Sequence, residues 1–252
     1  MKEPWYSGAL ADIHDSDYSF LARAAADTAM SKLPPPAESG IVVDLGCGSG
    51  VTAEILDKAG YSVVGVDASP DMISIARQRV PTGDFVTASI YEADIPDCQA
   101  VLAIGEVFNY QTEDRTDAAV AKLLRQIAAS LRPDGFLLCD VAGPGRVTPE
   151  NAQQVVSGEG WTMRVAVSED AKGRELTRDI EIDVTNAWIG RTQIAPSTGP
   201  TLAHEAHRLQ LIEPGAFRSL LIASGLNPEQ LLGYAGFDFP LGWSGWLARP
   251  SA

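Results

Sequence analysis

The chain has 252 residues, of which 45% are hydrophobic and 21% are charged, so it can fill the core of one elaborated domain. Acidic residues outnumber basic residues by 33 to 19, which gives a formal net charge of −14 at pH 7. A field of that sign repels phosphate backbones and anionic lipids, so we expect a small-molecule partner, no nucleic acid and no membrane.

Residues 1–39 predict a helical segment ahead of the main fold. Residues 6–32 are rich in alanine and place apolar side chains at near-helical spacing. The run LPPP at residues 33–36 ends this pattern, because proline lacks the backbone donor that a helix interior requires.

Short apolar runs alternate with amphipathic stretches between residues 40 and 148. Ser69 suits a helix N-cap, and Gly60 suits the residue that follows a helix. This alternation predicts an α/β fold with a doubly wound, mostly parallel sheet and helices on both faces. The expected strands cover residues 41–45, 62–67, 84–89, 100–105 and 135–141, and the expected helices cover residues 51–60, 69–80 and 116–131.

The pattern changes after residues 143–146 (GPGR), and residues 149–212 predict a small antiparallel sheet inserted after the fifth strand. Residues 174–184 and 203–212 alternate with a period of two, which is typical of strands with one apolar and one solvated face. The alternation places Arg178, Glu205 and His207 on the apolar face. Residues 213–252 then predict a helix and a strand pair that complete the main sheet.

The three cysteines, Cys47, Cys98 and Cys139, have no metal-ligand spacing. Each lies in a strand-like apolar context or beside a glycine turn. We therefore expect reduced, buried thiols, no metal site and a cytoplasmic protein.

The stretch IVVDLGCGSG at residues 41–50 carries the strongest functional signal. A buried strand runs into three alternating glycines, which a ligand-binding turn requires more often than a bare turn does. The dinucleotide fingerprint needs glycine or alanine at position 51, where Val51 stands, and the lysine of a phosphate-binding loop is absent. An acid before the glycines, Asp44, suits a cationic ligand better than a pyrophosphate.

Asp44 within DLGCGSG, followed by Asp67 at the end of the next strand and then by Ser69, Pro70 and Met72, resembles the motifs of class I S-adenosylmethionine-dependent methyltransferases. The resemblance is clear over residues 38–145 and looser over residues 213–252. It implies a Rossmann-like seven-stranded sheet, S-adenosylmethionine as cofactor and S-adenosylhomocysteine as product. It also implies that residues 1–39 cover the cofactor. The cofactor-binding residues that it implies are Asp44, Gly46, Cys47, Gly48, Gly50, Asp67, Ala68, Met72, Ser89, Ile90 and Gly105.

One part of the sequence departs from the family pattern. Members commonly have an acid after the third strand that meets the adenine amino group, whereas Ser89 and Ile90 stand near that position and Asp94 comes too late. The carboxylate of Asp67 is expected to accept hydrogen bonds from both ribose hydroxyls.

The catalytic candidates are His207 and Glu106, where the latter lies in the segment GEVFNY that the family places under the methionine part of the cofactor. For His207 a hydrogen-bonded core histidine is the alternative to a general base. Arg178 is expected either to pair with a core acid such as Glu205 or to bind a substrate carboxylate. The expected acceptor-binding residues are Tyr18, Asn109, Arg178 and Glu205.

The predicted function is therefore methyl transfer to an unidentified small-molecule acceptor, and a homodimer is possible. Two alternatives stay open at this point. One is an NAD(P)-dependent reductase, against which Val51 and Asp44 argue. The other is a protein that binds the S-adenosyl ligand without catalysis.

Overall fold

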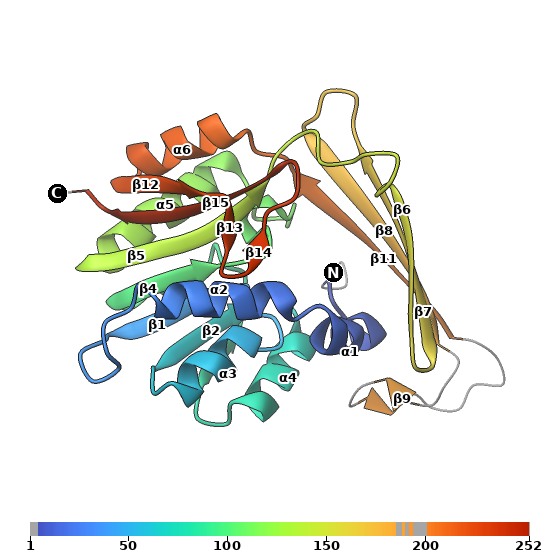
Figure 1. The fold of residues 1–252 in the computed structure, drawn as a ribbon, viewed down its shortest axis with the longest axis horizontal. Coiled ribbons are helices and arrows are strands. Elements are labelled where there is room, and N and C mark those ends of the chain that lie inside the picture. The colour runs from blue at the N-terminus through green and yellow to red at the C-terminus, as the bar shows by residue number, and fades with distance from the viewer. Residues whose placement is uncertain (1–4, 185–187, 190–191, 194–200, 252) are drawn as a thin grey trace.

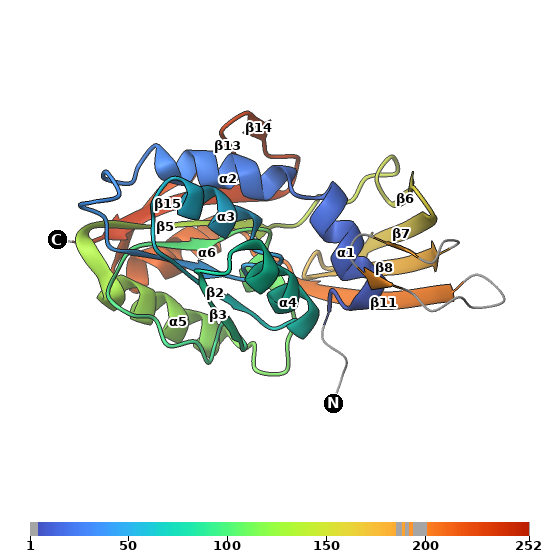
Figure 2. The same cartoon turned by 90° about the horizontal axis from the view of Figure 1, so that it is seen from below.

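The computed structural model describes residues 5–184, 188–189, 192–193 and 201–251. Two helices open the chain, α1 (Gly8–Asp17) and α2 (Phe20–Met30), where the sequence suggested one helical region. They separate because they pack on different partners. Leu10 and Ile13 of α1 pack against the inserted sheet, whereas the alanines of α2 pack in the core of the main fold. Figure 2 shows α1 between the two parts of the molecule.

The main sheet has seven strands in the order β12-β15-β5-β4-β1-β2-β3. The strands β1 to β5 run parallel to one another, and β15 pairs antiparallel with both β5 and β12. This confirms the doubly wound, mostly parallel sheet (Figure 1). The strands are β1 (Ile41–Leu45), β2 (Val63–Asp67), β3 (Asp84–Thr87), β4 (Cys98–Ala103), β5 (Leu131–Ala142), β12 (Leu226–Leu231) and β15 (Trp243–Pro250).

Helices cover both faces of this sheet. One core cluster joins β1, β2 and β4 to α2, α3 (Val51–Lys58) and α4 (Pro70–Arg79). The other joins the sheet to α5 (Asp117–Ser130) and α6 (Pro214–Ala223) on the opposite face. The helix boundaries follow local chemistry. Ser69 caps α4 by accepting a hydrogen bond from the Met72 N–H at 3.2 Å, and Gly60, at φ +93°, follows α3.

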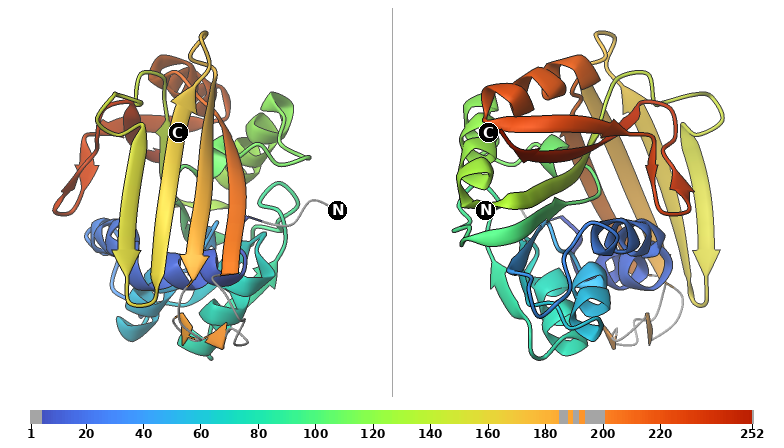
Figure 3. Two further views of the ribbon diagram at one scale, coloured as in Figure 1. Left: turned by 90° about the vertical axis from the view of Figure 1, so that its right-hand side faces the viewer. Right: turned by 60° about the vertical axis from the view of Figure 1, so that its left-hand side comes forward.

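The inserted sheet is antiparallel, with the strand order β11-β8-β7-β6. Its strands are β6 (Gln153–Gly158), β7 (Trp161–Glu169), β8 (Glu175–Val184) and β11 (Thr201–Gln210). Figure 3 shows it standing beside the main fold. The register sets His207 opposite Arg178 and Glu205 opposite Ile180, so the predicted faces are confirmed.

Short elements complete the described chain. They are η1 (Val107–Asn109), the pair β9 (Trp188–Ile189) and β10 (Thr192–Gln193), and the hairpin β13 (Gly233–Tyr234) and β14 (Phe237–Asp238). Across the described ranges, no helix has the length and apolar character needed to span a bilayer.

Candidate active site

A cavity opens at the carboxyl ends of β1, β2 and β4, where open parallel sheets bind ligands. Ten of the predicted cofactor residues line it, and Tyr18 lines it from the end of α1. Gly50 does not, and neither do Glu106, Asn109, Arg178, Glu205 or His207. The ten are Asp44, Gly46, Cys47, Gly48, Asp67, Ala68, Met72, Ser89, Ile90 and Gly105.

The three glycines of the turn have different roles, although all have positive φ. A Cβ on Gly46 would lie 2.6 Å from Val107, and a Cβ on Gly50 would lie 3.0 Å from Ala76 of α4, so these two permit close packing. A Cβ on Gly48 would meet no protein atom within 4 Å. Of the three, only Gly48 leaves open space at the cavity wall.

Two carboxylates face this end of the cavity. Asp67 accepts hydrogen bonds from the backbone N–H groups of Gly48 at 2.9 Å and Ser69 at 2.8 Å. Asp44 is 2% exposed, and its Oδ2 has no hydrogen-bond partner among the described residues. Burial, and then the neighbouring Asp67, raise the pKa of Asp44 to about 7. Burial also raises the pKa of Asp67, against the effect of its two backbone donors.

This geometry fits S-adenosylmethionine. A buried carboxylate oxygen without a partner matches a ligand ammonium group, which would satisfy its charge. Asp67, at the end of β2, keeps lone pairs free for ribose hydroxyls, and Gly48 allows close approach of the backbone. Adenine contacts by Ser89 and Ile90 stay a prediction, although both residues line the cavity.

Replacement of Gly48 by valine should abolish cofactor binding while the protein stays folded, because the new side chain would occupy the open space beside Asp67. Titration calorimetry with S-adenosylhomocysteine measures this. Gly236→Val is the matched control, since Gly236 also has positive φ and open space but does not line the cavity. Equal affinity in the two variants would show that the backbone at Gly48 does not approach the ligand.

Another part of the cavity lining consists of rings that we call the aromatic wall: Trp5, Tyr6, His14, Tyr18 and Tyr110. The Tyr6 ring meets the His14 ring edge-on at 4.8 Å, and the Trp5 ring lies 5.0 Å from that of Tyr110. The hydroxyls of Tyr6 and Tyr110 lie 2.6 Å apart. Burial, and then Arg178, lower the pKa of His14 to about 4, so its imidazole is neutral at physiological pH. Of these residues, only Tyr18 was predicted from the sequence to belong to the site.

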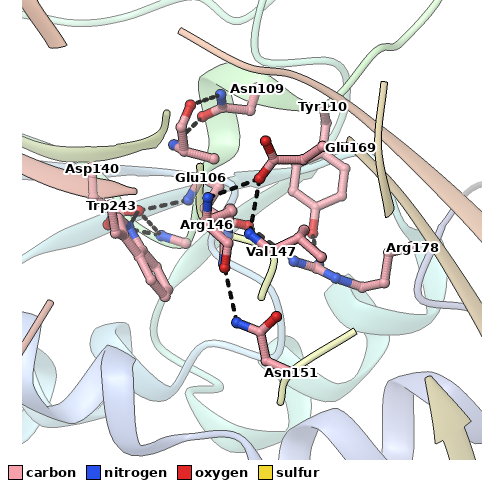
Figure 4. A network of polar contacts seen from close by, with 12 residues as sticks. Glu106, Asn109, Tyr110, Asp140, Arg146, Val147, Asn151, Glu169, Arg178 and Trp243 are labelled. Carbon is pink, nitrogen blue, oxygen red and sulfur yellow. Dashed lines mark hydrogen bonds and ion pairs between the residues drawn. The ribbon is translucent and has the colours of Figure 1, made fainter. Parts of the chain in front are cut away.

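A charged cluster lies next to Tyr110 of the aromatic wall (Figure 4). Glu106 is 3% exposed and is shared by two arginines. Arg178 contacts its Oε2 at 3.2 Å, and Arg146 contacts its Oε1. Arg178 also lies 3.5 Å from the hydroxyl of Tyr110, to which it donates. Arg178 thus pairs with a buried acid, as one of the two alternatives expected, but that acid is Glu106 from the loop after β4 and not the suggested Glu205.

Glu205 instead ties the N-terminal segment to the inserted sheet. Its carboxylate accepts from the backbone N–H groups of Tyr6 and Ser7, both at 2.8 Å, and from the Ser7 hydroxyl at 2.9 Å. It also contacts His207 Nε2 at 2.8 Å. His207 is fully buried, and burial lowers its pKa. These contacts favour the core-histidine alternative for His207.

Asn109 and Asp140 have partners that build the loops around the site. Asn109 donates to the carbonyls of Ala142 and Gln210 and accepts from the Ala142 N–H. With these three contacts its amide joins β5 to β11 and does not line the cavity, so acceptor binding by Asn109 stays a prediction without geometric support. In the part of the chain that the structure describes, no group of three or more His, Cys, Asp or Glu residues could hold a metal ion.

Asp140 is fully buried and accepts hydrogen bonds from four donors. Two are the N–H groups of Gly105 and Glu106, and two are the hydroxyl of Tyr234 and the indole N–H of Trp243. Asp140 therefore holds the loop after β4, in which both Gly105 and Glu106 have positive φ.

Comparisons with known proteins agree with this geometry. A family model described as a methyltransferase domain matches residues 42–135. The dTDP-3-amino-3,6-dideoxy-alpha-D-glucopyranose N,N-dimethyltransferase of Streptomyces fradiae is 27% identical over 90% of this chain and 88% of its own length. The dTDP-3-amino-3,4,6-trideoxy-alpha-D-glucopyranose N,N-dimethyltransferase of Streptomyces venezuelae is 26% identical over 88% of this chain and 92% of its own length. The S-adenosylmethionine-bound structure of an amino pentose methyltransferase from Micromonospora echinaspora superposes over 100% of both chains, with a TM-score of 0.74 and 18% identity.

Proposed function

Because this chain is a class I S-adenosylmethionine-dependent methyltransferase of small molecules, we propose that it methylates the amino nitrogen of a nucleotide-linked amino sugar. The observation that carries the proposal is the extent of the match to the two amino-sugar N,N-dimethyltransferases. A match over 90% of the chain extends beyond the cofactor-binding core into the inserted sheet.

The chemistry of the cavity supports an amine acceptor. The described residues that line it include two aspartates and no lysine or arginine, so they offer no lysine or arginine cation to a carboxylate acceptor. Arg178, which the sequence suggested as the partner of such a group, forms an ion pair with Glu106 instead. The hydroxyls of Tyr6 and Tyr110 are placed to hold a polar acceptor at the aromatic wall.

The cofactor supplies an activated methyl group bound to a sulfonium. An uncharged acceptor nitrogen would take this methyl group with its lone pair as the C–S bond breaks, and the product ammonium would release its proton to solvent. The residues that line the cavity contribute alignment and the exclusion of water. Asp44 would hold the ammonium group of the cofactor and Asp67 its ribose hydroxyls, and the aromatic wall would close the acceptor side. A general base at His207 or Glu106 stays a prediction, because neither residue lines the cavity.

Incubation with a dTDP-linked 3-amino sugar and S-adenosylmethionine should add one and then two methyl groups, as read by mass spectrometry. The matched control is the same sugar with a hydroxyl in place of the amine. A neutral hydroxyl is a much weaker nucleophile and requires a base, so we expect no product from it. Methylation of the hydroxyl analogue and not of the amine would contradict the proposal. A homodimer and a cytoplasmic location also stay predictions.

A further inference from the structure

Residues 5–8, which we call the strap, join the main fold to the inserted sheet at the cavity. The two aromatic residues of the strap line the cavity. On the side of the main fold, the Tyr6 carbonyl accepts a hydrogen bond from the Ser69 hydroxyl at 2.8 Å. The Gly8 N–H donates to Asp71 on the same side, at 2.7 Å. These contacts fasten the strap to the start of α4.

Glu205 provides the hold on the side of the inserted sheet. Its Oε1 accepts from the Ser7 N–H at 2.8 Å and from the Ser7 hydroxyl at 2.9 Å, and its Oε2 accepts from the Tyr6 N–H at 2.8 Å. The indole N–H of Trp5 adds a hydrogen bond to the Ala206 carbonyl at 3.2 Å. One carboxylate on β11 thus receives three donors from the strap.

These contacts hold Tyr6 in an unfavourable backbone conformation. Its φ is +57°, in the left-handed region that a residue with a bulky side chain rarely adopts. Such a conformation persists only where the surrounding contacts impose it. Glu205 and Ser69 impose it here, because they bind the N–H and the carbonyl of this one residue from two separate elements. Loss of either contact therefore favours release of the strap.

Ser69 connects the strap to the cofactor-binding residues. Its N–H donates to Asp67 Oδ1 at 2.8 Å, and its hydroxyl donates to the Tyr6 carbonyl. Asp67 is the carboxylate expected to hold the ribose. The Tyr6 side chain extends to the aromatic wall, where its hydroxyl lies 2.6 Å from that of Tyr110. The position of the strap therefore affects the cavity both beside the cofactor and at the aromatic wall.

We propose that the strap opens to exchange ligands and closes over the bound cofactor, and that Glu205 is the positioning residue that holds the closed state. The strap precedes α1 and is held by hydrogen bonds to a few groups, so it opens locally while the sheet that carries Glu205 stays folded. Closure places Tyr6 in the cavity lining and excludes water, and release of S-adenosylhomocysteine then requires opening. This inference needs only the cofactor and not the identity of the acceptor.

The test compares Glu205→Ala, which removes all three contacts, with Glu205→Gln, which keeps one acceptor oxygen. Glu181→Ala is the control, because Glu181 is exposed on the same sheet, opposite His204, and its loss removes the same charge without touching the strap. The measurement is the dissociation rate of labelled S-adenosylhomocysteine. One hydrogen bond to a charged group is worth about a factor of ten in an equilibrium constant, so the rate should rise by about tenfold or more in the alanine variant. The rise should be smaller in the glutamine variant and absent in the control.

Hydrogen exchange separates a positioning role from a structural one. The amides of residues 6–8 should exchange faster in Glu205→Ala, while the amides of β8 and β11 keep the rates of the parent enzyme. Saturation with S-adenosylhomocysteine should slow exchange in the strap of the parent by about tenfold or more, and by much less in the alanine variant. If Glu205→Ala does not fold, Ser7→Ala removes one donor and keeps the contact of Glu205 with His207. Its dissociation rate should rise by about threefold.

Two results would overturn the inference. One is an unchanged dissociation rate in folded Glu205→Ala, or in Ser7→Ala where it replaces that variant. The other is exchange in the strap that the ligand does not slow. Faster exchange throughout β8 and β11 would show that Glu205 stabilises the sheet as a whole, and it would overturn the positioning role as well. Both readouts use S-adenosylhomocysteine alone, so they hold or fail independently of whether the enzyme methylates an amino sugar.

Discussion

Asp44→Asn should weaken the binding of S-adenosylhomocysteine by about 100-fold at pH 8. Loss of one partner of a buried, hydrogen-bonded charge pair typically costs about 2–5 kcal/mol, and the lower part of that range corresponds to about this factor. Asp44 is 2% exposed, and its Oδ2 has no other partner among the described residues, so asparagine would leave the ligand ammonium without a counter-charge. Calorimetry at pH 8 measures the change.

The same substitution should alter the stability of the ligand-free protein in the opposite direction. The pKa of Asp44 is about 7 in the folded state, above the usual value of 3.8. The folded state therefore holds a proton that the unfolded state releases between about pH 4 and pH 7. The contribution of Asp44 to stability is largest at low pH and is lost as the pH rises through that window. The asparagine variant lacks this loss, so ligand-free protein should melt higher than the parent at pH 8, by a smaller margin at pH 5 and not at all below about pH 4.

Asp134→Asn is the control for both measurements, because Asp134 is exposed and lies outside the cavity. It should change neither the affinity nor the pH dependence of melting. If the Asp44 variant binds the ligand as tightly as the parent, the ammonium is held elsewhere. If its melting temperature falls at pH 8, the carboxylate has a structural partner in the ligand-free protein.

The parts of the fold that were predictable from sequence are those set by local patterns. The strand and glycine turn at residues 41–50 carry their own signal, since buried β-branched residues and positive-φ glycines need no distant partner. The faces of β8 and β11 followed from the two-residue period of a strand, which put Arg178 and His207 on the apolar side without any knowledge of their neighbours.

The partners of those side chains were not predictable. Arg178 meets Glu106 and Tyr110 because β8 and the loop after β4 are brought together in the folded chain, and no spacing in the sequence encodes that meeting. The aromatic wall has the same origin. Trp5 and Tyr6 reach the cavity because Glu205 and Ser69 bind the backbone of the N-terminal segment from two separate elements.

The break between α1 and α2 also depends on tertiary structure. Apolar spacing continues across residues 6–32, so local propensity alone favours one helical region. Two packing partners divide it, because α1 packs on the inserted sheet while α2 packs on the main fold.

Asn109 is a residue that the sequence motif singled out without revealing its contacts. The motif suggested acceptor binding by this residue, but its amide bonds to the carbonyls of Ala142 and Gln210 and it does not line the cavity.

Asp140→Ala should produce a larger loss of stability than any other substitution proposed for this protein. Four donors converge on this fully buried carboxylate, and alanine would leave all of them unpaired. Removal of one partner from a buried charged network typically costs about 3–5 kcal/mol, which corresponds to a fall in melting temperature on the order of 10 °C for a chain of this size. Burial raises the pKa of Asp140 to about 6, so the measurement belongs at pH 8, where the carboxylate is ionised.

Cofactor affinity should fall in this variant as well, because Gly105 lines the cavity and its N–H donates to Asp140. Tyr234→Phe and Trp243→Phe are the matched controls, since each removes one side-chain donor and leaves the two backbone donors of the loop in place. Each control should lower the melting temperature by less than half as much and leave S-adenosylhomocysteine affinity within about threefold of the parent. Those two donors come from β13 and the start of β15, whereas the Gly105 and Glu106 N–H groups belong to the loop that shapes the cavity. If the alanine variant melts within about 2 °C of the parent, the loop after β4 is held by other contacts, and the positive φ of Gly105 and Glu106 does not depend on Asp140.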